Sequence, residues 1–291
     1  MRLTAGARWD THDLYPSTVV SPSAAVTISA PSGIDVHLGW GHYAQFPDLA
    51  LLTSPFGGSR LLPERANHVS LAIERRLGNS ARLRVEGWNR NDRDLLARPF
   101  FDFRIRNGVI QPVSAALFNS ARGYSRGIQF VLQTRSANRL SGWTSYTLSY
   151  ARQRESRLGI AYWADEDQRH LANTYLSYRL RPSLNLSGRW AYGSGEPIPG
   201  FLTVRDGLYY LAPQRNQVRL SSYQRLDFRA NKSFTYDAWK LTLFGEIINA
   251  TNRRNLRYLS FDGLNGATQR AFLTVDRVFP IVPVAGVTFE F

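Results

Sequence analysis

Apolar and polar residues alternate with a period of two along most of the chain. The final segment, residues 283–291 (PVAGVTFEF), places Val287, Phe289 and Phe291 on one face and small or polar residues on the other. Because successive strand side chains point to opposite faces, this pattern predicts a strand with one apolar and one hydrated side. A terminal strand that stops on an aromatic residue favours a transmembrane β-barrel, in which closure removes the sheet edges.

Alternation and turn residues together predict twelve antiparallel strands, so the expected fold class is all-β. They are placed at residues 2–11, 24–30, 35–45, 67–77, 81–91, 122–135, 141–152, 169–180, 184–193, 223–233, 239–249 and 278–291. The joins 31–34, 78–80, 136–140, 181–183 and 235–238 are short, whereas the joins 46–66, 92–121, 153–168, 194–222 and 250–277 are long. Strict alternation of short and long joins is typical of outer-membrane barrels, which have tight periplasmic turns and long extracellular loops.

The positions of the aromatic residues fit this orientation. If the short joins are periplasmic, one set falls late in the outward-running strands and a second set falls at the inner boundary. Such sorting predicts the two aromatic girdles of a membrane barrel. The outer girdle would contain Trp9, Trp40, Trp88, Tyr150 and Trp190, and the inner one Tyr178, Phe234 and Trp239, with Phe291 at the same boundary.

Charged residues take the face opposite to the aliphatic ones. Leu83 and Val85 alternate with Arg82 and Arg84, and a similar alternation of apolar with charged or polar residues recurs in three other predicted strands. One face would therefore meet lipid and the other a hydrated lumen. Phe244 breaks this pattern. If these twelve strands closed on one another without a plug, we would expect the inward-facing arginines to crowd one another.

Composition supports a wall of strands rather than helices. Aromatic residues make up 13% of the 291 residues, there is no cysteine, and no apolar run approaches the roughly 20 residues that a spanning helix needs. The formal charge of +14 would suggest a nucleic-acid partner, but the charge is nearly all arginine and is dispersed along the chain. We therefore expect no nucleic-acid partner, and instead lipopolysaccharide phosphates outside the barrel and acidic residues within it.

Several segments carry a resemblance to a known family. They are YQRLDFRANKSF with Arg225, Asp227 and Phe234, WKLTLFGEIINATNRRN with Asn249, Asn252 and Asn255, and the earlier segments LTAGARWD, SPSAAVTIS, LLPERANHVSLAIERRL and ARGYSRGIQFVLQT. In this order they resemble the second half of the barrel of TonB-dependent outer-membrane receptors. Each motif is degenerate, and only the ordered set is specific.

The resemblance implies that residues 1–291 form the C-terminal part of a barrel of about 22 strands around a plug. It also implies energy-coupled uptake of a scarce ligand of the iron-chelate, cobalamin or glycan class, driven by the TonB complex through the plug. Neither a plug domain, a signal peptide nor an energy-coupling box is visible, so the first barrel half and the plug are expected as partners. In the family the terminal aromatic strand is read by the barrel-assembly machinery, which makes Phe289 and Phe291 candidates for that signal.

Candidate ligand contacts lie in the long joins. Aromatic and arginine side chains are enriched at binding hot spots and suit stacking and anion capture. The same side chains are equally suited to packing one loop against another. The candidates are Phe46, Phe56, Arg60, Tyr162, Trp163, Tyr209, Tyr210 and Arg215.

No enzymatic motif stands out, and we expect neither catalysis, a cofactor nor a metal site. The chain lacks the nucleophile-elbow, zinc-protease and phosphate-loop signatures. His170 lies close to Asp165, Glu166 and Asp167, but such a loop cluster is expected to be a solvated surface rather than a base or metal site.

Two alternatives from other classes remain open. One is a self-contained twelve-stranded barrel, acting as a channel or a surface hydrolase. The other is a soluble β-rich binding protein. A barrel preceded by its own signal peptide would favour the first, and fractionation with soluble proteins without detergent would favour the second.

Overall fold

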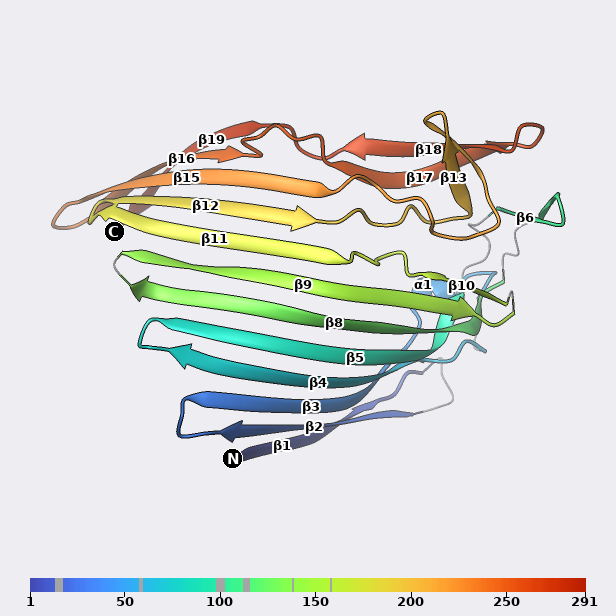
Figure 1. Cartoon of the computed structure of the whole chain (residues 1–291), viewed down its shortest axis with the longest axis horizontal. Coiled ribbons are helices and arrows are strands. Elements are labelled where there is room, and N and C mark those ends of the chain that lie inside the picture. Colours follow the sequence, from blue (N-terminus) through green and yellow to red (C-terminus); the bar gives the residue numbers. More distant parts are fainter. Residues whose placement is uncertain (14–17, 58–59, 98–102, 112–115, 138, 158) are drawn as a thin grey trace.

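The wall of the molecule is one path of twelve antiparallel strands, each hydrogen-bonded to the next (Figure 1). The computed structural model describes residues 1–13, 18–57, 60–97, 103–111, 116–137, 139–157 and 159–291. The path follows the chain order and confirms the all-β expectation. Its strands are β1 Arg2–Asp10, β2 Val19–Ser29, β3 Ile34–Gln45, β4 Glu64–Leu77, β5 Ala81–Ala97, β8 Phe118–Ala137, β9 Leu140–Glu155, β11 His170–Arg181, β12 Leu184–Gly193, β15 Tyr223–Thr235, β16 Lys240–Ile248 and β19 Val282–Glu290.

Short and long joins alternate as the sequence predicts. Figure 1 shows the tight turns at one end of the strands and the long loops at the other. The loops carry the helix α1 Leu49–Leu52 and the strands β6 Arg104–Arg106, β7 Val109–Gln111, β10 Ile160–Trp163, β13 Leu202–Arg205, β14 Leu208–Leu211, β17 Leu256–Asn265 and β18 Arg270–Arg277. No helix in the described parts of the chain is long and apolar enough to cross a membrane.

Several strands extend further toward the loops than the alternation indicates. β5 runs to Ala97 instead of residue 91, and β8 begins at Phe118 instead of residue 122. These extensions pair with each other, since Ala97 lies opposite Phe118 and Ala121 opposite Glu155. These ends lie beyond the lipid, so their side chains no longer alternate between apolar and polar, although the backbone hydrogen bonds continue. The alternation therefore predicts strands that are too short.

One face of the sheet exposes a continuous apolar surface. Neighbouring strands align their apolar residues, as in the cross-strand row from Leu83 to Leu132 and the row from Ile73 through Val85 to Phe130. Leu132 and Phe130 are each 42% exposed. A water-soluble protein rarely leaves so large an apolar face uncovered, so this face is the side that meets lipid.

The opposite face carries charges that are largely neutralised. Arg82 lies 3.2 Å from Glu74, and Arg229 lies 3.1 Å from Glu246. Arg84 contacts Glu86 at 2.8 Å. The expectation that arginines within the barrel pair with acidic residues is therefore confirmed for these three, whose partners come from the same strand or from its neighbour.

Aromatic rings on this polar face lie over glycines. The Phe244 ring covers Gly286 on the neighbouring strand, and the guanidinium of Arg229 lies 4.0 Å from the ring centre. The Trp88 ring covers Gly127 in the same way. These contacts explain why Phe244 breaks the alternation. They also distinguish Trp88 from Trp40 and Trp190, which are 43% and 39% exposed on the apolar face.

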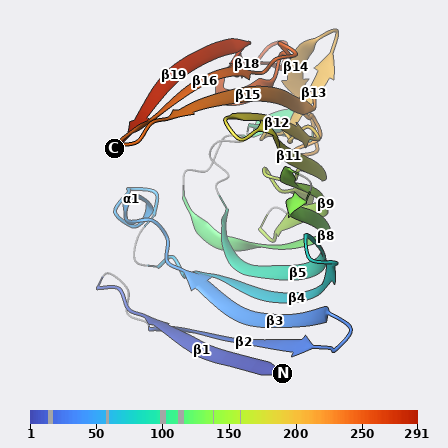
Figure 2. The same cartoon turned by 90° about the vertical axis from the view of Figure 1, so that its left-hand side faces the viewer.

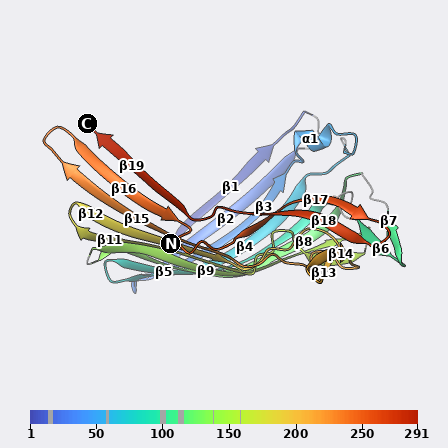
Figure 3. The same ribbon diagram turned by 90° about the horizontal axis from the view of Figure 1, so that it is seen from above.

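The sheet is curved but open. β1 pairs only with β2 and β19 only with β16 among the described residues. Figure 2 shows these two edge strands at opposite limits of the curve, and Figure 3 shows that the loop strands gather at one end of it. Both edges therefore present unpaired backbone groups that another strand could complete.

Candidate functional site at the long-loop end

Two long loops build a small sheet of their own beyond the wall. β13 and β14 from the loop 194–222 join β18 and β17 from the loop 249–281 in the order β13-β14-β18-β17. Ile198, Leu202 and Ala271 form the buried core beneath it, each at most 3% exposed. The loops are thus folded structures that are held in fixed positions relative to the wall.

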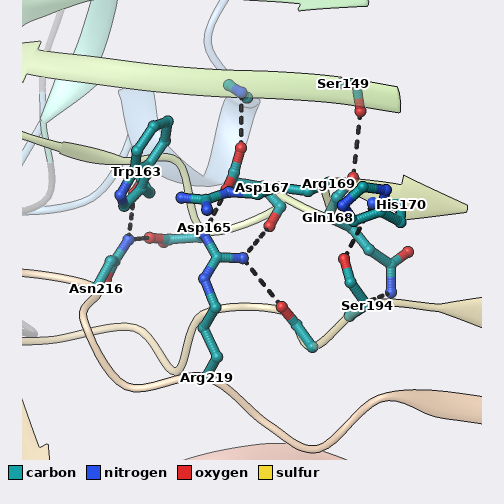
Figure 4. Close-up of polar contacts among 12 residues, drawn as sticks. Ser149, Trp163, Asp165, Asp167, Gln168, Arg169, His170, Ser194, Asn216 and Arg219 are labelled. Atoms are coloured by element: carbon teal, nitrogen blue, oxygen red, sulfur yellow. Dashed lines mark hydrogen bonds and ion pairs between the residues drawn. The ribbon is translucent and has the colours of Figure 1, made fainter. Parts of the chain in front are cut away.

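Asp167 fastens the loop 156–169 to the loop 194–222. Its carboxylate is fully buried, accepts a hydrogen bond from the backbone N–H of Ala151 at 2.7 Å, and forms an ion pair with Arg219 (Figure 4). Arg219 also donates to the backbone oxygens of Asp167 at 2.7 Å and Gly195 at 3.0 Å. The Arg219 guanidinium therefore joins the two loops, and Asp167 joins them to the end of β9.

Asn216 makes a second connection between the same loops. Its side chain is fully buried and donates to the backbone oxygen of Trp163 at 2.7 Å and to Asp165 at 2.6 Å. Its side-chain oxygen accepts from the N–H of Gly200 at 3.1 Å. Arg215 forms an ion pair with Asp165 at 2.5 Å, and its guanidinium lies 4.6 Å from the centre of the Tyr162 ring.

We use the name loop latch for the set Asp165, Asp167, Asn216 and Arg219. The expectation that the acidic cluster near His170 is a solvated surface is wrong for Asp167, which is buried and paired, whereas Asp165 is paired but its side chain is 38% exposed. Glu166 is exposed, and His170 contacts the Tyr146 hydroxyl at 2.8 Å. Within the described residues, no three His, Asp or Glu side chains converge as a metal site would require.

Trp163 lies between arginines at the edge of the latch. The guanidinium of Arg169 lies 4.4 Å from its ring centre and that of Arg152 lies 5.0 Å away. The Tyr150 ring is 6.4 Å distant. Such cation–π contacts help to orient the indole.

The structure brings only some of the predicted contact residues together. Tyr162, Trp163 and Arg215 meet around the latch, and Tyr209 packs on the core of the loop sheet. Phe46 packs against a separate cluster of Leu52, Leu61 and Leu117.

The remaining three candidates are more accessible. Phe56 is 47% exposed, Arg60 is exposed, and Tyr210 is partly exposed with Arg205 5.7 Å from its ring centre. The loop-packing alternative therefore describes at least Tyr209, and all eight positions remain predictions as ligand contacts.

The motif residues behind the family resemblance have structural roles. Asn249 is 1% exposed, adopts a left-handed backbone with φ of 51°, and donates to the backbone oxygens of Arg253 and Phe279 at 3.0 Å each. Asp227 accepts from the N–H of Asn249 at 2.9 Å. Asn255 bonds both backbone groups of Gln224, at 2.9 and 2.8 Å. These contacts anchor the loop 249–281 to the outer ends of β15 and β16.

Sequence reasoning missed Asn216 and Arg219 as the centre of the loop assembly. Neither belongs to an aromatic or alternating pattern, and their partners lie about 50 residues away, at separations of 51 to 53 residues. A polar residue in a loop becomes recognisable as buried only when the partner loop is in place.

In the loop sheet, two hydroxyl groups hold the pKa of the Asp262 carboxyl below its usual range. They are those of Ser260, which has the larger effect, and Thr274, and both donate hydrogen bonds to this carboxylate.

Comparisons with solved structures find the same architecture. The ferric preacinetobactin receptor BauA from Acinetobacter baumannii is 16% identical, with a TM-score of 0.66, and the match covers 99% of this chain and 40% of that one. A mutant of the ferric enterobactin receptor PfeA from Pseudomonas aeruginosa gives 16% identity and a TM-score of 0.66, covering 99% and 42%. The iron transporter FrpB from Neisseria meningitidis gives 14% identity and a TM-score of 0.63, covering 99% and 43%.

The chain thus spans less than half the length of these proteins. No curated protein sequence matches it. Residues 1–250 match the family described as TonB dependent receptor-like, beta-barrel. The chain therefore belongs to the TonB-dependent receptor β-barrel family, whose receptors and transporters reside in the outer membrane of Gram-negative bacteria.

Proposed function

We propose that this chain is part of the wall of an outer-membrane receptor that takes up a scarce ligand of the iron-chelate, cobalamin or glycan class. The observation that carries the proposal is the loop assembly at one end of a family-typical wall, with aromatic and arginine side chains held in place by the loop latch. An iron chelate is our first choice, because BauA, PfeA and FrpB are described as iron or ferric-siderophore proteins.

We assign the chain to the C-terminal part of that wall. The order of the motifs that resemble the second half of the family's barrel is the ground for this assignment. The unpaired edges of β1 and β19 support the presence of further strands, because backbone groups that face hydrocarbon without partners cost several kcal/mol each. Further strands would complete the barrel, and a plug inside it would receive the pull of the TonB complex. The polar inner face, with paired charges such as Arg84 and Glu86, suits contact with such a plug.

Among the eight candidates, Phe56, Arg60 and Tyr210 are the best placed to contact a ligand. All three retain exposed side-chain surface at the loop end. Tyr162, Trp163 and Arg215 would act indirectly, by fixing the loops that present the others. Aromatic faces and a guanidinium suit a ligand that combines aromatic rings with negative charge, as many iron chelates do.

Uptake in the native bacterium tests this function. Deleting the gene should abolish uptake of one labelled ligand class among ferric chelates, cobalamin and maltodextrins. Restoring it with Phe56→Ala and Tyr210→Ala together should weaken that uptake, whereas Tyr236→Ala, an exposed aromatic at the short-turn end, should not. Unchanged uptake of all three classes after deletion would contradict the proposal, and so would equal effects of the two sets of variants.

The lipid-facing aromatics and the terminal strand have proposed roles as well. Trp9, Trp40, Tyr150 and Trp190 would lie at the outer interface, and Tyr178, Phe234 and Trp239 at the inner one. Lipopolysaccharide would surround the outer end of the wall.

Phe289 and Phe291 would be read by the barrel-assembly machinery. Phe291 is fully exposed, so Phe291→Ser removes no packing. It should lower the outer-membrane yield in cells far more than the stability of folded protein. Normal amounts of heat-modifiable, inserted protein would remove Phe291 as a signal.

A further inference from the structure

Six exposed arginines lie on the lipid-facing side of the wall, at the long-loop ends of four neighbouring strands. Strand alternation places them on that face, since Arg126 shares it with Ile128 and Phe130, and Arg65 shares it with Val69. We call this set the arginine band. It consists of Arg65 on β4, Arg93 on β5, Arg122 and Arg126 on β8, and Arg152 and Arg154 on β9, all of them exposed.

The band concentrates like charges that have no acidic ion-pair partner among the described residues. Arg65 lies directly opposite Arg93, and Arg122 directly opposite Arg154. Like charges placed opposite each other in a sheet are destabilising. In the described parts of the chain no carboxylate forms an ion pair with any member of the band, whereas the inward-facing Arg82, Arg84 and Arg229 all have such partners.

A hollow of ≈ 500 Å³ opens among these side chains. Its lining includes Arg93, Arg122, Arg152 and Arg154, together with Tyr124 and Ala161. Asp92 also borders it, but its carboxylate accepts a hydrogen bond from Arg90 at 2.6 Å on the opposite face of β5. The hollow is therefore lined by four arginines at the loop end of a face whose middle is apolar.

The position of the arginine band along the strands indicates which layer of the membrane it faces. Arg126 lies directly opposite Tyr150, and Arg152 lies opposite Trp163 on β10. Tyr150 shares its face with Leu148, which lies opposite the lipid-facing Ile128, and the Trp163 ring lies 6.4 Å from that of Tyr150. Aromatic side chains sit at the level of lipid headgroups, so the band faces the headgroup layer of the outer leaflet.

We propose that the arginine band binds the phosphate groups of a phosphorylated glycolipid in the outer leaflet, with the hollow between β5, β8 and β9 holding one of them. Arginine is suited to this role because its planar guanidinium binds phosphate through two parallel hydrogen bonds. The proposal rests on the outer-membrane location. It assigns a binding site to the lipopolysaccharide that the proposed function places around the outer end of the wall. It does not depend on ligand uptake, so either can fail while the other stands.

Lipid A, the phosphorylated anchor of lipopolysaccharide, is the direct probe. The protein purified from outer membranes is delipidated in detergent, and binding of lipid A is measured by native mass spectrometry. The test variant combines Arg122→Gln with Arg154→Gln, which removes an opposed like-charge pair and should not impair folding, as heat-shift electrophoresis verifies. The matched control is Arg75→Gln, which alters an exposed arginine on the same face at the short-turn end of β4.

The double variant should weaken binding of lipid A at least tenfold, since each basic residue near an anionic lipid surface contributes about 1 kcal/mol. Fully dephosphorylated lipid should bind the unaltered protein equally weakly, and Arg75→Gln should change little. Three results would overturn the proposal. They are equal binding of phosphorylated and dephosphorylated lipid, equal losses in the test and control variants, and binding of a soluble phosphorylated disaccharide or of DNA as tight as that of lipid A.

Discussion

The middle of the wall exposes apolar side chains, whereas the loop assembly buries polar ones. Mid-strand residues of the wall leave leucines, valines and phenylalanines exposed, because lipid is the surrounding medium. The largest fully buried side chains of the described chain all belong to the long-loop end, namely Ile198, Leu202, Asn216, Asn249, Asn255, Asp167 and Pro63. Four of these seven side chains are polar, so buried polar groups are concentrated at the long-loop end.

The wall and the loops are therefore held in place by different interactions. In the wall, each strand is fixed by its backbone ladder, so a side chain needs only the correct face. In the loops, position depends on a few buried polar contacts whose partners must match in geometry. We therefore expect conservative changes to be tolerated in the wall and poorly tolerated in the loop latch.

The largest expected effect comes from Asp167→Ala. It leaves Arg219 without its ion partner and the N–H of Ala151 without an acceptor, and breaking a buried pair costs about 3–5 kcal/mol. The loop 194–222 should open far more often, so trypsin should cleave at Arg215 and Arg219 much faster. Glu166→Ala, at the exposed neighbouring position, is the control. Similar cleavage rates for both variants would show that the latch does not hold the loops.

The next effect tests the wall. Leu243→Arg should lower the free energy of unfolding in lipid by about 2–4 kcal/mol, because Leu243 is 40% exposed at mid-strand on the apolar face. Thr242→Arg should cost much less, because Thr242 lies on the polar face, where its hydroxyl contacts that of Ser233 at 3.0 Å. If unfolding in lipid vesicles showed equal costs, the assignment of faces in β16 would be wrong.

A smaller effect is expected at the junction of wall and loops. Asn249→Ala should destabilise the loop 249–281 by about 1–3 kcal/mol, since it leaves the buried backbone groups of Arg253 and Phe279 unpaired. Asn249→Gly loses the same hydrogen bonds but accepts the positive φ, so it should cost less than the alanine variant. Hydrogen exchange of the loop amides measures both changes, and a glycine variant no better than alanine would exclude the backbone contribution.

The smallest effect is a pH dependence of the β17–β18 hairpin. The lowered pKa of Asp262 means that its carboxylate stabilises the hairpin above the ordinary aspartate pKa and that this contribution is lost as pH falls through the lowered value. NMR signals of β17 and β18 should therefore change at strongly acidic pH. Ser260→Ala removes the leading hydrogen bond, so the transition should move to higher pH. A midpoint that does not move would contradict this assignment.

Sequence reasoning reached the wall because its order is periodic. The face of a residue such as Leu83 or Arg84 can be read from its immediate neighbours, and short turns rich in Gly, Pro, Asn and Ser mark where one strand ends and the next begins. The loop latch could not be predicted, because its residues follow no periodic pattern. Asp167 and Arg219 carry no local sign of burial, and the ladders of β5, β8 and β9 continue past the end of the apolar alternation. The eight proposed contact residues had the right chemistry, but chemistry alone could not separate Tyr209, which packs in a core, from Phe56, which is accessible.

Glycines opposite inward-facing aromatics give the lumen its shape. Phe244 lies flat over Gly286 and Trp88 over Gly127, and a methyl group at either glycine would overlap the ring. Alanine at position 286 or 127 would therefore rotate the ring of Phe244 or Trp88 away from the sheet and toward the space that the polar face borders. A substitution of one carbon atom on a strand could in this way narrow the passage more than many larger changes, without altering a single charge.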